Sequence, residues 1–125
     1  MILACQGYAQ HTLTLKSSAD TWIDERANYR TRNYADDTKV DVMCLSFSGV
    51  DARSRGYVNF NFASIPKNAT ITKASLSLYF WPDSPSSHYP RGDNQFTLRR
   101  VTSPWEEKTL TWANGANLQV SNQNS

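Results

Sequence analysis

The strongest constraint on the fold of this 125-residue chain is a repeated alternation of apolar and polar side chains. Neighbouring side chains of a β-strand point to opposite faces, so alternation predicts strands with one buried face. No stretch carries the apolar stripe of period 3.6 that an amphipathic helix needs. We expect strands at residues 11–17, 39–47, 57–62, 75–80, 95–101 and 109–112.

The alternation also assigns faces to the side chains. In "YVNFNF" it predicts that Val58 and Phe60 point inward and Tyr57 points outward. In "SLSLYF" it predicts an inward Leu78 and an outward Tyr79. The predicted outward tyrosines therefore lie on two different strands.

Turn-forming residues separate these segments, at Ser48-Gly49, at residues 66–68 and in "PDSPSSHYPRGDN". Short alternating strands without crossover helices indicate an antiparallel all-β domain. One sheet alone would leave an apolar face in water, so two sheets must pack together. The sequence therefore predicts a single domain with the architecture of an antiparallel β-sandwich.

Composition excludes several classes of function. The formal net charge is only +2 and the basic residues are scattered, which argues against nucleic-acid binding. No apolar run reaches the roughly 18 residues of a transmembrane helix. His11 and His88 lack a recognisable nucleophile or acid partner in a motif, so we do not expect an enzyme.

The two cysteines support different predictions. Leu3-Ala4-Cys5 loosely matches the end of a bacterial lipoprotein signal, which predicts export and a lipid anchor at Cys5. Cys44 lies in an apolar run, and we favour a small buried side chain over a disulfide partner. We expect a signal remnant or disordered terminus at 1–10, a β-sandwich module at 11–115, and a polar tail or the start of missing strands at 116–125.

Three sequence blocks occur together in the order that a known family shows. They are "ADTWIDERANYRTRNYADDTKVDV", "RGYVNFNFASIPKNATITKASLSLYF" and "RRVTSPWEEKTLTWAN". In this order they resemble surface domains of the DNRLRE type, including carbohydrate-binding module family 96. The resemblance implies a jelly-roll-like sandwich within a larger, multidomain bacterial protein, secreted or on the cell surface. Such domains continue beyond the third block, which implies that the last strands are lacking here.

Glu106 and Glu107 stand between two tryptophans, as the carboxylates of a glycosidase could. Neighbouring side chains of an extended segment face opposite ways, and adjacent residues do not reach the ~5–9 Å separation of a catalytic pair. The resemblance implies structural roles for Trp105 and Glu107. We therefore expect no catalysis at this pair.

Acidic side chains gather in the first half of the chain. Oxygen ligands on loops suit Ca²⁺, although the spacing matches no EF-hand. Solvated or turn-forming carboxylates are the favoured interpretation, and calcium is the alternative. The candidate ligands are Asp20, Asp24 and Asp36.

Aromatic and arginine residues in the predicted loops are the best candidates for sugar binding. A sugar ring packs its C–H face on an aromatic ring, and neighbouring polar groups bind its hydroxyls. Arginines would suit an acidic polysaccharide, because guanidinium pairs with carboxylate. Trp22 and Trp112 are expected in the core instead. The candidate ligand-binding residues are Arg30, Tyr34, Tyr57, Tyr79, Trp81, Tyr89 and Arg91.

The leading hypothesis is thus a non-catalytic, polysaccharide-binding module outside the cell. The alternative is a structural or adhesive spacer domain without a glycan ligand of its own. The two differ in whether exposed aromatic rings share one face.

Overall fold

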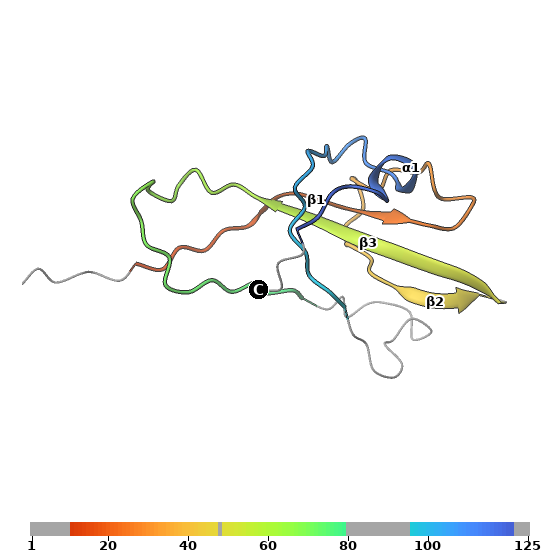
Figure 1. The fold of residues 1–125 in the computed structure, drawn as a ribbon, viewed down its shortest axis with the longest axis horizontal. Helices are drawn as coiled ribbons and strands as arrows, with labels where there is room; N and C mark the ends of the chain where they lie inside the picture. The colour runs from red at the N-terminus through yellow and green to blue at the C-terminus, as the bar shows by residue number, and fades with distance from the viewer. Residues whose placement is uncertain (1–10, 48, 80–95, 122–125) are drawn as a thin grey trace, which may run out of the picture.

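The computed structural model describes residues 11–47, 49–79 and 96–121. Its elements, in chain order, are β1 (Ser17–Asp24), β2 (Cys44–Phe47), β3 (Val50–Phe60) and α1 (Trp112–Gly115), a single helical turn (Figure 1). Strands dominate, so the all-β prediction is confirmed. None of the helices in the described ranges is long and apolar enough to cross a membrane.

The three strands form one antiparallel sheet with the order β1-β3-β2 (Figure 1). Phe47 pairs with Val50, so the chain reverses where the sequence predicts a turn. Gly49 in that turn has φ of 80°, a conformation that glycine adopts without strain. At the far end of β3 the β1 register shifts, and the Ser18 hydroxyl donates to the Asn59 carbonyl oxygen at 3.2 Å.

One face of the β1–β3 pair carries the hydrophobic core. Ile23 and Tyr57 pack there against Leu110 and Trp112 from the C-terminal segment. That segment crosses the sheet with α1 on top of it (Figure 1). Partly buried residues extend the same cluster, namely Val101, Trp105, Ala116 and Leu118. The burial of Trp22 and Trp112 that the sequence predicts is confirmed, with 5% and 4% of each residue exposed.

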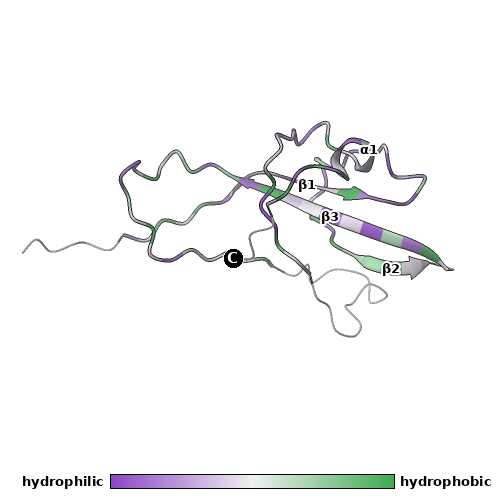
Figure 2. Cartoon of the chain, viewed as in Figure 1, coloured by the Kyte–Doolittle hydropathy of each residue, from purple (hydrophilic) through white to green (hydrophobic). Residues whose placement is uncertain are grey.

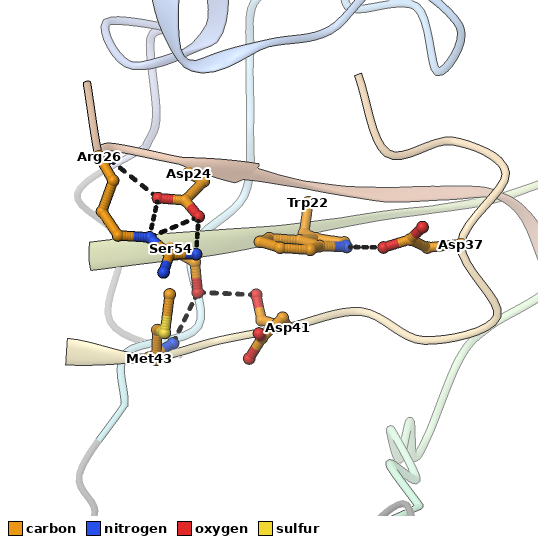
Figure 3. Close-up of polar contacts among 7 residues, drawn as sticks. All are labelled: Trp22, Asp24, Arg26, Asp37, Asp41, Met43 and Ser54. Atoms are coloured by element: carbon orange, nitrogen blue, oxygen red, sulfur yellow. Dashed lines mark hydrogen bonds and ion pairs between the residues drawn. The ribbon is translucent and has the colours of Figure 1, made fainter. Parts of the chain in front are cut away.

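The opposite face is covered by the long connection from β1 to β2. The Trp22 ring stacks on Tyr34 with centroids 3.8 Å apart, and its indole N–H donates to Asp37 at 3.0 Å (Figure 3). Val40 lies against Gly56, the residue that pairs with Trp22 across the sheet. β3 is therefore packed on this face at Gly56 and on the other face at Tyr57.

Polar side chains fix the end of β1 and the middle of β3 to this connection. Asp24 is fully buried, and both of its carboxylate oxygens accept hydrogen bonds from Arg26, which raise the pKa of Arg26 (Figure 3). The buried Ser54 hydroxyl donates to the Asp41 carbonyl oxygen and accepts from the Met43 amide (Figure 3). These bonds satisfy buried polar groups that would otherwise be costly.

Several predicted strands take another form. Residues 109–112 are not a strand, because the Glu106 carbonyl accepts the amides of Thr109 and Leu110 and α1 begins at Trp112. Residues 11–16, 61–79 and 96–100 belong to no strand, although Val101 makes an isolated bridge to Val120. The alternation of apolar and polar residues did not predict β1. A second sheet is not seen in the described ranges, so the sandwich stays a prediction.

Three predictions of side-chain environment are wrong. Leu78 is 62% exposed, although the alternation predicts that it points inward. Tyr57 is buried, with 7% exposed, whereas Val58 is 38% exposed, so the assigned faces of that segment are reversed there. Cys44 is exposed and not buried, because its strand lies at the sheet edge. Figure 2 shows apolar and polar residues interleaved along the first half of β3. Ala52 and Ser54 are buried there on one face, whereas Tyr57 is buried on the other face further along the strand, so a single inward face does not describe β3.

Candidate functional site

Two of the predicted sugar-binding aromatics are packed inside the molecule. The Tyr57 hydroxyl donates to the Gly115 carbonyl at 3.0 Å, and its ring lies tilted against Trp105 with centroids 5.6 Å apart. Tyr34 is 5% exposed and stacks on Trp22. Burial raises the pKa of both tyrosines. Neither ring therefore offers a free face to a sugar in this structure.

Of the other aromatic residues predicted to bind sugar, only Tyr79 lies within the described residues. Tyr79 is 94% exposed, which agrees with the outward direction that the alternation predicts. Trp81, Tyr89 and Arg91 lie outside the described residues. The structure thus brings no two of the predicted aromatic rings together on one exposed face within its described ranges.

Arg30, by contrast, lies in a cluster of exposed arginines. Arg53 donates from its Nε and Nη2 atoms to the two carboxylate oxygens of Glu25, each at 2.6 Å. Arg30 and Arg55 also act on the same carboxylate. The pKa of Glu25 is lowered, first by the hydrogen bonds from Arg53 and then by the charges of all three arginines. We call Arg30, Arg53 and Arg55 the arginine patch.

The sheet and α1 position this patch. Arg53 and Arg55 lie two residues apart on β3, so both project from the face that carries the core. Arg55 donates to the Ala116 carbonyl at 2.6 Å, and its guanidinium lies 5.0 Å from the Trp112 ring centroid. The Arg30 carbonyl accepts the Ala113 amide at 3.0 Å. The Arg30 backbone and the Arg55 side chain are therefore fixed to α1 and its C-cap residue, Ala116.

The patch carries more positive than negative charge. Glu25 is one carboxylate among three guanidinium groups, and Asp51 also acts on Arg53. Arg30, Arg53 and Arg55 are all exposed. Guanidinium groups in this arrangement can pair with a carboxylate or sulfate of a ligand.

Arg53 and Arg55 were not among the residues predicted from the sequence. The signal was present in "RSR", because two arginines separated by one residue share a face of any strand. What the sequence could not show is that the loop residues Glu25 and Arg30 lie beside them, since that depends on the pairing of β1 with β3.

The sequence model of carbohydrate-binding module family 96 matches residues 11–124, nearly the whole chain. The chain belongs to this family. The resemblance of its three sequence blocks is thereby confirmed. No curated protein and no solved structure matches the chain. As a carbohydrate-binding module, it comes from a class of domains that is generally non-catalytic.

The glutamate pair of this family 96 module fits a structural role. A Glu107 carboxylate oxygen accepts the Asp20 amide of β1 at 2.8 Å, and its carbonyl accepts the Asn33 side-chain amide at 2.7 Å. Glu106 is exposed. Glu107 therefore fixes the Trp105 turn to the sheet edge and to the first long loop.

The three aspartates predicted as alternative calcium ligands have separate partners. Asp24 is bonded to Arg26, Asp36 forms an ion pair with Lys108 at 2.5 Å, and Asp20 accepts a hydrogen bond from Ser17 at 2.8 Å. Across the described ranges, no group of three or more His, Cys, Asp or Glu side chains could hold a metal ion. Calcium binding stays an untested prediction.

Proposed function

We propose that this carbohydrate-binding module is a non-catalytic part of a secreted or cell-surface bacterial protein and that it binds an acidic polysaccharide at the arginine patch. The family match over residues 11–124 carries the carbohydrate part of the proposal. The module would hold a larger protein, with its other domains, on the glycan. A lipid anchor at Cys5, outside the described residues, would keep that protein at the cell surface.

The acidic ligand is inferred from the chemistry of the patch. Three exposed guanidinium groups around one carboxylate favour a ligand that brings its own negative charges. Uronate carboxylates or sulfate groups can each accept two parallel hydrogen bonds from an arginine. The hydrogen bond that fixes the Arg55 side chain to Ala116 reduces the entropy lost when a ligand binds.

The second candidate function is a spacer or adhesive domain without a glycan ligand. The burial of Tyr34 and Tyr57 favours it, because two of the predicted sugar-binding rings are occupied by packing. The exposed ring of Tyr79 and the arginine patch favour binding.

Affinity electrophoresis separates these candidates. Polygalacturonate in the gel is expected to retard the module, and hydroxyethylcellulose to retard it less. Arg30→Gln should weaken retardation by polygalacturonate about tenfold, since one charge-assisted hydrogen bond is worth roughly 1.5–3 kcal/mol. Arg99→Gln, an exposed arginine outside the patch, is the matched control and should change nothing.

The competing outcomes are distinct. Retardation by neither polysaccharide would support the spacer function. Retardation by polygalacturonate that Arg30→Gln and Arg99→Gln weaken equally would keep acidic-glycan binding but remove it from the arginine patch. Added salt should weaken the specific retardation, because exposed charges are screened.

A further inference from the structure

A hollow of about 340 Å³ opens beside the Trp105 turn. Its wall is formed by the turn that precedes α1 and by α1 itself, and the lining includes Trp105, Glu106, Thr109, Asn114 and Leu118. Its volume lies at the small end of the range of ligand-binding pockets, roughly 300–1,000 Å³. It is therefore large enough for a single small ring rather than for a long ligand.

Trp105 gives the hollow an aromatic wall that is held in place. The ring is half-buried, packs against the core cluster and lies 5.6 Å from the Tyr57 ring centroid. Tyr57 is in turn fixed by its hydrogen bond to Gly115. An aromatic ring that is already fixed loses little entropy on binding, so it suits the apolar C–H face of a sugar.

Polar groups stand at the edge of the same hollow. Glu106 is exposed, and its carboxylate has no hydrogen-bond partner in the described part of the chain. The Asn114 side-chain oxygen accepts a hydrogen bond from the Thr111 amide, and one of its two N–H groups donates to the Thr109 carbonyl. The second N–H group is left to bind a ligand. The carboxylate can accept from sugar hydroxyls, and the free N–H can donate to one.

We infer that this hollow is a sugar-binding subsite for one uncharged pyranose ring, with Trp105 stacking on the ring and Glu106 accepting its hydroxyl protons. A carboxylate at the edge disfavours a uronate there, so the subsite takes a neutral sugar whereas the arginine patch takes an acidic one. The inference rests on the proposed carbohydrate binding but not on the arginine patch. Asn114 of α1 lines the hollow, and Ala113 and Ala116 contact Arg30 and Arg55, so α1 borders both sites.

Nuclear magnetic resonance of the tryptophan indole N–H groups tests the subsite. The whole chain is titrated with neutral β-linked hexasaccharides of glucose, xylose and mannose, and separately with hexagalacturonate. The Trp105 resonance, assigned by its loss in Trp105→Phe, is expected to shift with at least one neutral hexasaccharide. Glu106→Ala should weaken that binding about tenfold. Glu106 is exposed, so this variant avoids the core disruption that a truncated Trp105 would cause.

Lys108→Gln is the matched control, because Lys108 is exposed in the same turn but does not line the hollow. Its affinity for the neutral sugar should equal that of the unchanged chain. A Trp105 resonance that no neutral hexasaccharide shifts, with hexagalacturonate still bound, would overturn the subsite and leave the proposed function standing. Binding of no saccharide at all would overturn both. Equal weakening by Glu106→Ala and Lys108→Gln would also overturn the subsite.

Discussion

Tyr57 and Tyr79 show how pairing partners decide the role of a side chain. Tyr57 is buried between the sheet and α1, and its hydroxyl donates to the Gly115 carbonyl. Tyr79 is 94% exposed and lies in no strand. The alternation around each residue is the same, so local sequence could not distinguish them.

The Tyr57 hydrogen bond can be tested with a matched pair of variants. Tyr57→Phe keeps the ring against Trp105 but leaves the buried Gly115 carbonyl without its partner. We expect the free energy of unfolding to fall by about 0.5–1.5 kcal/mol, seen as a lower urea midpoint with an unchanged m-value. Tyr79→Phe should leave the midpoint unchanged. Equal effects of the two substitutions would contradict the burial of Tyr57.

Burial along β3 explains which residue predictions succeeded. Ala52 and Ser54 are buried on one face, and Tyr57 is buried on the other. Alternation predicts that the same face of a strand is buried along its whole length. This prediction fails in β3, because the buried side chains lie on one face at first and on the opposite face further along the strand. Trp22 and Trp112 were predicted correctly because their size makes burial favourable on whichever face they lie.

At the scale of elements, the end of β2 at Phe47 was predictable, whereas the start of β3 at Val50 and the helical turn α1 were not. Ser48-Gly49 is a local turn signal, and β2 ends directly before it, with Phe47 pairing with Val50. The alternation in "TLTW" predicts a strand. In the structure the Asn114 side chain instead accepts a hydrogen bond from the Thr111 amide, a helix-capping interaction. The side-chain bond satisfies the free amide at the start of a helical turn, and the helical turn forms.

At Gly56 the connection from β1 to β2 lies close against the sheet. A Cβ atom at this position would lie 2.4 Å from Val40 Cγ1 and 3.1 Å from Val42 Cγ2. We expect Gly56→Ala to destabilise the fold by about 1–3 kcal/mol through overpacking, measured by urea unfolding. Adding Val40→Ala should restore part of that loss. Ser46→Ala on the exposed part of β2 is the control, and a similar loss in that variant would contradict the explanation.

At the scale of the whole molecule, the sequence predicted the all-β class but not the arrangement around the sheet. Strand pairing between distant segments depends on contacts that local patterns do not encode. The arginine patch illustrates the same limit, because Arg30 and Arg53 act on the same Glu25 carboxylate only through the pairing of β1 with β3. The alternating segments at 71–78 and 96–98 expose their apolar residues, namely Ile71, Leu76, Leu78, Phe96 and Leu98.

Those exposed side chains predict the behaviour of the chain in solution. Apolar residues in contact with water bind hydrophobic dyes and promote self-association. The double variant Leu78→Ser/Phe96→Ser should therefore reduce the fluorescence of bound anilinonaphthalene sulfonate and the oligomer fraction in sedimentation. Its urea midpoint should stay unchanged, because neither residue packs in the core cluster. Thr72→Ser, also exposed, is the control for both measurements. A loss of about 1.5–3 kcal/mol per residue would instead show that these side chains are buried in the folded protein.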